Sequence, residues 1–180
     1  MIDLDYIVHS TSTDNEKGIA SGWRDCELSE IGTQQSFKLK SLLSGKSYDL
    51  VYCSDLKRAV QTAQNAFGAS VKIIQDARLR ECNYGEFNGM PKSVFKENMV
   101  QYVNKLYPNG ESYEEVAHRV SDFIATLKVI HQNERVAIIS HHAPQLALEV
   151  IVHNKSWQEA LDNDWRNTGN WSPTWNYIIK

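Results

Sequence analysis

The sequence predicts an α/β protein, built as a three-layer α/β/α sandwich around a mostly parallel sheet. Three observations lead to this class. Short, continuous apolar runs alternate with segments in which apolar residues recur every three or four positions. Several of these runs carry few polar residues, which is typical of parallel strands covered by helices on both faces. The 180 residues, 42% of them hydrophobic, suffice for one sizeable core, so we expect a single domain over residues 1–180.

Each predicted element depends on its own local pattern. Strands are expected where apolar residues run almost without interruption, at residues 5–9, 48–54, 71–76, 134–142 and 175–180. Helices are expected where the spacing of apolar residues is helical, at residues 28–43, 55–67, 110–132 and 143–153. Ser29 is expected to cap the first of these helices, and Ser54 or Asp55 the second.

Composition excludes several classes of function. A net charge of −3 with scattered Lys and Arg argues against nucleic-acid and anionic-membrane surfaces. The three cysteines are odd in number and lack metal-type spacing, so we expect reduced thiols in a cytoplasmic protein. The N-terminus does not resemble a signal peptide, and no apolar run is long enough to span a bilayer. A monomer and a homodimer both remain open.

Candidate functional residues follow the predicted strands. In parallel sheets, ligands bind at the carboxyl ends of the strands. His9, Ser54 with Arg58 beyond it, Glu81 and His141 all lie at or after such ends. Arg58 favours an oxyanion such as phosphate, because its guanidinium matches that group in geometry and charge. From these residues alone, the two histidines are open to three interpretations: metal ligands, an acid and a base, or a nucleophile with its partner.

Six segments then resemble the motifs of one family, in that family's order. They are VHSTSTDN (8–15), SGWRDCELSEIG (21–32), VYCSDLKRAVQTA (51–63), RLRECNYGEFNG (78–89), PNGESYEEVAHRVSDF (108–123) and VAIISHHA (136–143). The chain therefore resembles the histidine phosphatase superfamily, in its phosphoglycerate-mutase-like branch. The motifs cover most of residues 4–150, so their combination is far more specific than any one of them.

The resemblance implies a role for each matched residue. His9 falls on the nucleophile that forms a phosphohistidine, Glu81 on the proton donor and His141 on the second histidine. Substrate binding is expected from Arg58, the phosphate-binding arginine, and also from Asn15, Ser10 and His142. The implied substrate is a small phosphorylated metabolite, with no metal and no cofactor. Such chemistry needs a neutral imidazole whose other nitrogen donates to a neighbour such as a backbone carbonyl, and a glutamate whose pKa is raised.

The chain departs from the family's first motif. Val8 stands where the motif has an arginine, and Ser10, Thr11 and His142 also replace motif residues. Loss of one charge-assisted hydrogen bond to phosphate costs about 1.5–3 kcal/mol, or roughly one to two powers of ten in affinity or rate. We expect partial compensation by the hydroxyls of Ser10 and Thr11. His142, Arg24 and Arg80 are the alternatives.

Three functions are compatible with these features. The first is a phosphomonoesterase, with activity reduced by Val8. The second is a non-catalytic pseudo-phosphatase that binds phosphorylated ligands. The third is a phosphoglycerate-mutase-type phosphotransferase. A lid is expected at about residues 88–110. It is shorter than the insertion usual in mutases of this family, which favours phosphomonoester hydrolysis.

Overall fold

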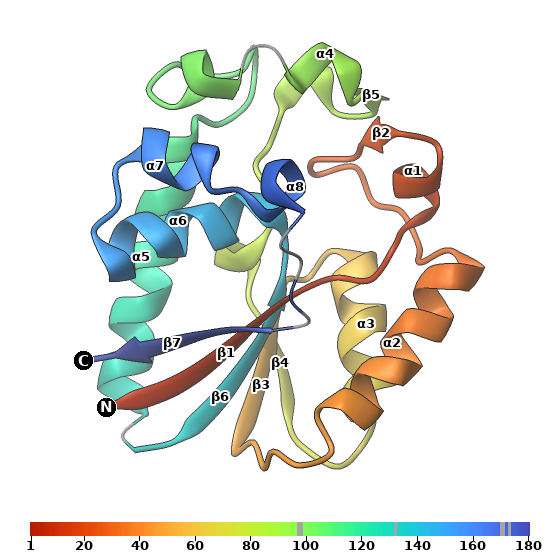
Figure 1. Cartoon of the computed structure of the whole chain (residues 1–180), viewed down its shortest axis with the longest axis vertical. Coiled ribbons are helices and arrows are strands. Elements are labelled where there is room, and N and C mark those ends of the chain that lie inside the picture. The colour runs from red at the N-terminus through yellow and green to blue at the C-terminus, as the bar shows by residue number, and fades with distance from the viewer. Residues whose placement is uncertain (97–98, 132, 170–171, 173) are drawn as a thin grey trace.

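The computed structural model describes residues 1–96, 99–131, 133–169, 172 and 174–180. Its main sheet has five strands in the order β4-β3-β6-β1-β7 (Figure 1). Their bounds are β1 (Ile2–Val8), β3 (Leu50–Cys53), β4 (Ile73–Gln75), β6 (Arg135–Ser140) and β7 (Trp175–Ile179). The first four strands of this order are parallel, and β7 pairs antiparallel with β1. The predicted mostly parallel sheet is confirmed.

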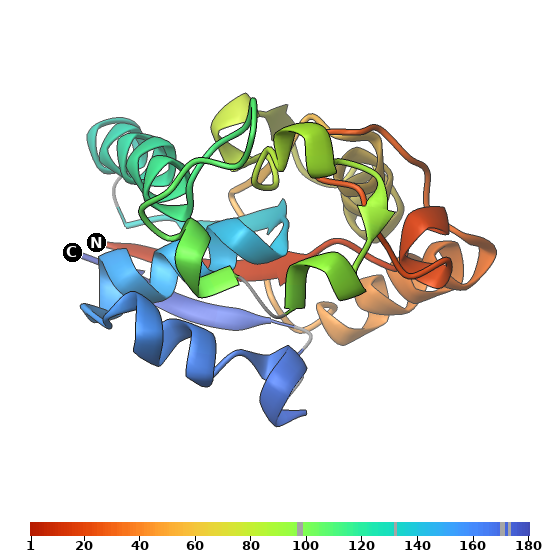
Figure 2. The same cartoon turned by 90° about the horizontal axis from the view of Figure 1, so that it is seen from above.

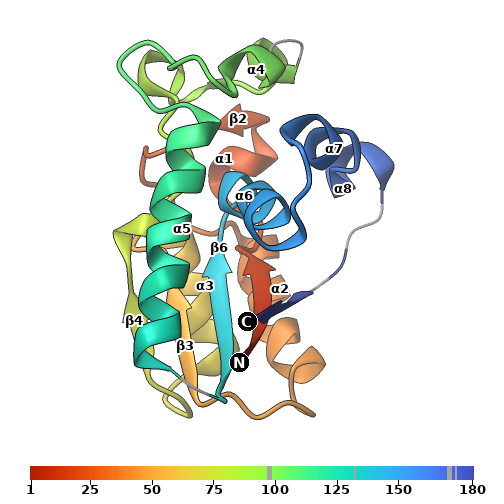
Figure 3. The same cartoon turned by 90° about the vertical axis from the view of Figure 1, so that its left-hand side faces the viewer.

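Helices cover both faces of this sheet. The four longer ones are α2 (Glu30–Leu42), α3 (Lys57–Phe67), α5 (Tyr113–Ile130) and α6 (His142–His153). Helices α2 and α3 lie on one face and α5 and α6 on the other, as the view from above (Figure 2) and the side view (Figure 3) show. The predicted three-layer sandwich is therefore confirmed. Residue 132, the expected end of the long helix, lies outside the described residues.

Shorter elements gather beyond the carboxyl ends of the parallel strands (Figures 1 and 3). The helices are α1 (Thr13–Glu16), α4 (Ser93–Lys96), α7 (Trp157–Asp162) and α8 (Trp165–Thr168), and 3-10 turns span Ala77–Leu79, Gly85–Phe87 and Met99–Tyr102. A two-stranded ribbon joins β2 (Ile19–Ala20) to β5 (Met90–Pro91). The expected lid at 88–110 thus contains β5, α4 and one 3-10 turn. Residues 97–98 of it lie outside the described part of the chain.

Alternation along the strands fills the two halves of the core. Leu4 and Tyr6 of β1 pack on the side of α5 and α6, whereas Ile7 packs on the side of α2 and α3. Successive side chains of a strand point to opposite faces, so a sheet buried on both sides needs apolar residues at almost every position. This explains why the strands appear in the sequence as continuous apolar runs. Within the described residues, no helix is both long and apolar enough to cross a membrane.

Helix starts only partly follow the predicted caps. The Ser29 hydroxyl accepts a hydrogen bond from the Gly32 N–H at the start of α2, as expected. The expected cap of α3 is wrong, because its cap position is Leu56, which provides no side-chain cap. Asp25, distant in sequence, instead accepts from the first N–H of α3 at 2.8 Å. The Asp55 carboxylate is occupied by Arg80, so tertiary contacts override the local signal.

Strand register brings the predicted site residues together. Val8 of β1 pairs with Ser140 of β6, so the residues that follow, His9 and His141, emerge side by side. The His9 N–H donates to the Ser140 carbonyl at 2.9 Å and prolongs this pairing by one residue. Two imidazoles that are far apart in sequence therefore meet at one edge of the sheet.

Candidate active site

His9 lies at the carboxyl end of β1 with its ring held by two neighbours. Its Nδ1 lies 2.7 Å from the Ser10 carbonyl oxygen, and the Arg58 Nε lies 3.3 Å from its Nε2. A carbonyl can only accept and a guanidinium can only donate, so Nδ1 carries the proton and Nε2 keeps its lone pair. Burial, reinforced by the Arg58 charge, lowers the pKa of His9 to about 3. The expected neutral imidazole, donating to a backbone carbonyl, is confirmed.

His141 faces His9 from the end of β6. The two ring centroids are 5.0 Å apart, with the ring planes inclined at 59°. The Tyr6 hydroxyl fixes the backbone, since it donates to the His141 carbonyl and accepts from its N–H. Neither ring nitrogen of His141 has a hydrogen-bond partner among the described residues, although both are buried. Burial holds its pKa well below the usual range. Unpartnered buried nitrogens are costly, so they point to a ligand.

Arg58 brings a buried positive charge to the histidine pair. It lies on the first turn of α3 with 2% of its surface exposed. Its guanidinium donates to the Gly22 carbonyl at 2.8 Å and the Arg24 carbonyl at 3.3 Å. Gly22 has φ +54°, and a Cβ there would lie 1.7 Å from the Asn88 Oδ1, so the turn that holds Arg58 requires glycine. No carboxylate of the described residues forms an ion pair with Arg58. A buried cation of this kind favours an anionic ligand.

Glu81 lies opposite the histidines with its carboxylate at the start of α6. One oxygen accepts from the N–H groups of Cys82 and Ala143, both at 2.9 Å, and the other accepts from the His142 N–H at 3.3 Å. Burial acts to raise the pKa of Glu81, but the N–H donors and the Arg58 charge outweigh burial and lower it. The expectation of a raised pKa is therefore wrong for the unliganded site, because the N-terminus of α6 stabilises the carboxylate.

Two side chains that sequence reasoning missed hold the backbone around Glu81. Arg119 donates to the carbonyls of Arg78 and Arg80 at 2.7 Å and of Glu81 at 2.9 Å. The indole of Trp23 donates to the same Glu81 carbonyl at 2.6 Å. Both residues lie in matched motifs, but nothing in the sequence indicates which backbone they contact.

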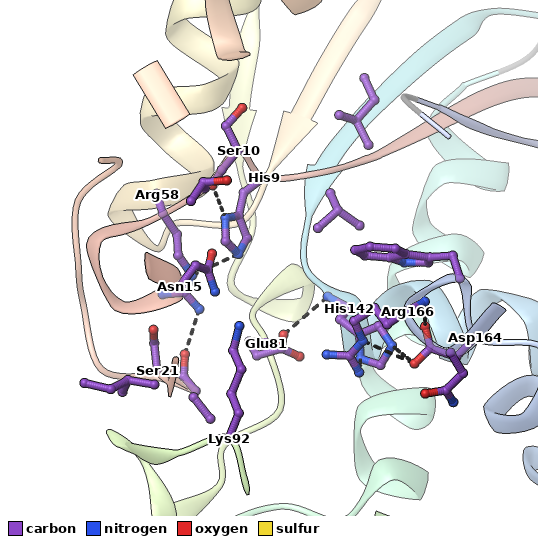
Figure 4. A pocket seen from close by; sticks show the side chains of 18 of the residues that line it. His9, Ser10, Asn15, Ser21, Arg58, Glu81, Lys92, His142, Asp164 and Arg166 are labelled. Carbon is purple, nitrogen blue, oxygen red and sulfur yellow. Dashed lines mark hydrogen bonds and ion pairs between the residues drawn. The ribbon is translucent and has the colours of Figure 1, made fainter. Parts of the chain in front are cut away.

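A cavity of about 880 Å³ opens above this cluster. Six of the seven residues expected in the site line it: His9, Ser10, Asn15, Arg58, Glu81 and His142 (Figure 4). The seventh, His141, is fully buried against the His9 ring. Thr11 and Val8 also line the cavity. The sequence-based site is thus assembled in one place.

Three cations of the cavity wall were not expected: Lys38, which is an exposed residue of α2, Lys92 and Arg166. Lys92 follows β5, and its N–H donates to the Gly18 carbonyl, which anchors it to the ribbon. Arg166 belongs to α8 near the end of the chain. Of the alternatives considered for Val8, neither Arg24 nor Arg80 lines the cavity, because their side chains pair with Asp14 and Asp55. Side chains of turns and of one-turn helices cannot be oriented from sequence periodicity, so no signal was available for Lys92 and Arg166.

The described residues contain no group of three or more His, Cys, Asp or Glu side chains arranged to hold a metal ion. The cationic groups that line the site are Lys38, Arg58, Lys92 and Arg166, and its imidazoles are neutral. Such a site can bind a compact oxyanion next to a nucleophilic nitrogen.

Fold and site together define an α/β protein with a cation-lined cavity where its parallel strands end. The family model of the histidine phosphatase superfamily (branch 1) matches residues 7–172. The chain belongs to this superfamily.

Comparison with individual proteins agrees with the family. The chain is 29% identical over 176 residues to phosphoserine phosphatase 1 of Hydrogenobacter thermophilus, covering 91% of this chain and 83% of the relative. It is 34% identical over 176 residues to the 2,3-bisphosphoglycerate-dependent phosphoglycerate mutase of Bartonella henselae, covering 88% and 84%. Among solved structures, the alpha-ribazole phosphatase from Shigella flexneri superposes with a TM-score of 0.76 at 25% identity, covering 88% of this chain and 83% of that one. The phosphoglycerate mutase from Bacillus anthracis shares the fold, with a TM-score of 0.75 at 20% identity over 85% of this chain and 80% of that one.

Proposed function

We propose that this chain is a phosphomonoesterase that hydrolyses a small phosphorylated metabolite through a phosphohistidine at His9. One observation carries the proposal: a neutral His9, with its Nε2 lone pair available, lies beside buried Arg58 and the unpartnered ring of His141. A nucleophile, a cation and a hydrogen-bonding imidazole are the parts that phosphoryl transfer through histidine requires.

In the proposed reaction, Nε2 of His9 attacks phosphorus while the ester P–O bond breaks. Arg58 contacts this nitrogen through a long 3.3 Å bond, which it exchanges for a phosphate oxygen when substrate binds. His141 stabilises the charge on the equatorial oxygens, with Asn15 and Ser10 at the edge of the phosphate site. Water then attacks the phosphohistidine, releasing phosphate and restoring His9.

Glu81 is the proposed proton donor to the leaving oxygen. Its carboxylate is ionised in the unliganded site, since its pKa is lowered. A phosphate dianion bound next to it raises that pKa, because two negative charges repel. The proton is therefore taken up together with the substrate, and Glu81 later accepts the proton of the attacking water. In this way one carboxylate serves both half-reactions.

Val8 stands where the resembled motif has an arginine, and we propose that Lys92 supplies the missing positive charge. Lys92 lines the cavity, and Figure 4 shows its side chain pointing toward the space between His9, Arg58 and Glu81. The electrostatic influence of Lys92 on His9 contributes to the lowered His9 pKa, after burial and Arg58. The hydroxyls of Ser10 and Thr11 would add hydrogen bonds to the phosphate.

We propose that residues 1–180 form a single domain in which segment 88–110 is the lid. Its ribbon strand β5 pairs with β2 and so connects the lid to the loop that follows His9. A short lid leaves room for water to reach a phosphohistidine, which favours hydrolysis over mutase chemistry. Acid-quenched labelling with a radioactive bisphosphorylated sugar acid distinguishes them. Release of labelled inorganic phosphate supports the phosphatase, and transfer to a second acceptor position supports the mutase.

The cellular setting is also part of the proposal. Cys26, Cys53 and Cys82 are all buried free thiols, which supports action in a reducing cytoplasm. The proposed partner is a small phosphorylated substrate, and not a nucleic acid or a membrane.

A phosphatase assay on a panel of phosphomonoesters tests the main proposal. Hydrolysis that is abolished in His9→Ala and retained in His118→Ala, an exposed histidine of α5, supports it. Acid-labile, base-stable phosphorylation of the wild-type chain, absent from His9→Ala, identifies the intermediate. Equal background in all three proteins, with phosphorylated ligands still bound, would instead support the pseudo-phosphatase that Val8 favours.

A further inference from the structure

Three residues outside the phosphate site form a hydrogen-bonded chain at its edge, and two of them, His142 and Asp164, are buried. His142 is the first residue of α6, and its Nε2 lies 2.8 Å from the Asp164 carboxylate. Its Nδ1 lies 2.6 Å from Nη2 of Arg166. The Arg166 Nε also donates to the Asp164 carboxylate, at 3.2 Å. Each residue of the trio therefore contacts both of the others.

The hydrogen-bonding capacity of the partners fixes the protonation of His142. A guanidinium can only donate, so Nδ1 of His142 accepts from Arg166, and the Nε2–H donates to Asp164. Burial, reinforced by the Arg166 charge, lowers the pKa of His142 and keeps the ring neutral. The trio thus contains one cation and one anion bridged by a neutral ring, which cannot rotate without breaking two bonds.

Arg166 faces the cavity from this fixed position. Its side chain is 38% exposed and lines the cavity, whereas the Asp164 carboxylate is 4% exposed. The bonds described above use Nε and Nη2, and Nη1 has no hydrogen-bond partner among the described residues. The Nη1 group of Arg166, a cation held in place by two partners, is therefore available to a ligand in the cavity.

The trio lies on the side of the leaving group. Figure 4 shows His142, Arg166 and Asp164 on one side of Glu81, with His9 and Arg58 on the other. Glu81 is the proposed donor to the leaving oxygen, so whatever lies beyond it belongs to the alcohol portion of the substrate. In the same view Arg166 lies apart from Arg58 and Lys92, the two cations that we propose for the transferred phosphate.

We propose that Arg166 is a specificity residue that binds a second anionic group, a carboxylate or a phosphate, on the alcohol portion of the substrate. His142 and Asp164 are positioning residues that aim its guanidinium. This inference depends on the proposed function and names the substrate class for it. An alternative, in which the trio merely pins α8 to α6, would leave Arg166 without effect on the choice of substrate.

Matched substrate pairs test the proposal. O-phosphoserine and O-phosphoethanolamine differ by one carboxylate, and fructose 1,6-bisphosphate and fructose 6-phosphate differ by one phosphate. In Arg166→Ala we expect KM for the member with the extra anion to rise about 10- to 100-fold, the effect of one charge-assisted hydrogen bond. We expect less than about a threefold change in kcat for both members, and in KM for the member that lacks the extra anion. The pair with the larger change tells whether the anion is a carboxylate or a phosphate.

Further variants separate positioning from simple structural support. Arg166→Lys should restore part of the discrimination, because it keeps the charge but loses the fixed fork. Asp164→Asn should raise KM for the doubly anionic member with little change in kcat. Arg135→Ala is the matched control, because that arginine also pairs with an aspartate but begins β6, at the end of the sheet away from the cavity. It should leave KM for all four compounds unchanged.

Two results would overturn the inference: an equal KM change for both members of each pair in Arg166→Ala, and no change in either. Thermal-shift titration of His9→Ala with the same four compounds compares the binding of the two members of each pair without turnover. If wild-type activity survives in His9→Ala, the proposed mechanism is wrong. A preference for the doubly anionic compounds that is lost in the His9→Ala, Arg166→Ala double variant would still support the role of Arg166.

Discussion

At the scale of single residues, the site is defined by imidazoles whose protons are assigned by their neighbours. His9 donates through Nδ1 to a carbonyl and keeps Nε2 for a guanidinium, while His142 has the opposite tautomer. His141 has no described partner for either nitrogen. Three neutral rings with three different environments allow separate tasks: attack, charge stabilisation and positioning.

The first prediction concerns Glu81 and pH. His9, with a pKa of about 3, stays a neutral nucleophile from about pH 4 upward. Glu81 has a lowered pKa, so its protonated fraction falls as the pH rises. We expect kcat/KM for an alkyl phosphate, which needs a protonated leaving group, to decrease from acidic to neutral pH relative to that for p-nitrophenyl phosphate. Stopped assays on both substrates over this range measure the ratio.

Glu81→Gln supplies the control for this profile. It should reduce alkyl phosphate hydrolysis by about 10²- to 10⁴-fold and p-nitrophenyl phosphate hydrolysis far less, because p-nitrophenolate leaves without a proton. The ratio between the substrates should then become independent of pH. Equal losses for the two substrates would remove Glu81 from the role of proton donor.

The second prediction concerns Val8 and Lys92. We expect Lys92→Ala to lower kcat/KM by about 10- to 100-fold, the effect of losing one charge-assisted contact to phosphate. In a Val8→Arg background the same substitution should cost much less, since the new arginine supplies that charge. Steady-state kinetics of the double-mutant cycle, with exposed Lys40→Ala of α2 as control, measure the coupling. Identical effects of Lys92→Ala in both backgrounds contradict the proposed compensation.

At the scale of elements, the loop that carries Glu81 depends on a contact from α5. Arg119 gathers three loop carbonyls and pairs with Glu111, with each side chain 15% exposed. The Ser140 hydroxyl of β6 adds a bond of 2.6 Å to the Leu79 carbonyl. A segment without long regular structure is thereby fixed to a helix and a strand, which a precise proton donor needs.

The third prediction tests this contact. Arg119→Ala leaves the three carbonyls and the Glu111 carboxylate without their partner. We expect the free energy of unfolding to fall by about 2–4 kcal/mol, with kcat reduced for alkyl phosphates more than for p-nitrophenyl phosphate. Urea denaturation and the two assays provide the measurements. Lys57→Ala, whose exposed ion pair with Glu27 contributes about 1 kcal/mol or less, is the comparison, and an equal loss of stability in both variants would argue against the role of Arg119.

The same scale explains which parts of the site the sequence could predict. His9 and His141 follow apolar runs, and the carboxyl ends of neighbouring parallel strands lie together, so their meeting was predictable. Lys92 lies in a turn and Arg166 in the four-residue helix α8, and both segments are too short for periodicity to tell which way a side chain points. The lowered pKa of Glu81 comes from N–H groups at the start of α6. Their direction depends on packing and not on local sequence.

At the scale of the whole molecule, burying three neutral histidines links stability to pH. The pKa values of His9, His141 and His142 are all lowered by burial. Below about pH 6.5 the unfolded chain binds protons that the folded chain does not, so stability is lost as the pH falls.

The fourth prediction follows from this linkage. Each of these histidines should remove at most about 1.4 kcal/mol of unfolding free energy per pH unit, from about pH 6.5 down to its own lowered pKa. Denaturant unfolding at several pH values between 7 and 5 measures the slope. His141→Gln should reduce the slope by the share of one histidine, and an unchanged slope in this variant would contradict the assignment of a neutral buried ring.

The placement of β7 has a consequence for biosynthesis. Strand β1, which is followed directly by His9, lies between β6 and β7 in the sheet. Until residues 175–179 have left the ribosome, one edge of β1 has unpaired N–H and C=O groups. Such an edge can pair with strands of other chains and cause aggregation. A premature stop codon at Trp175 should therefore yield insoluble material even though every proposed catalytic side chain is present, and sedimentation of freshly translated protein would reveal it.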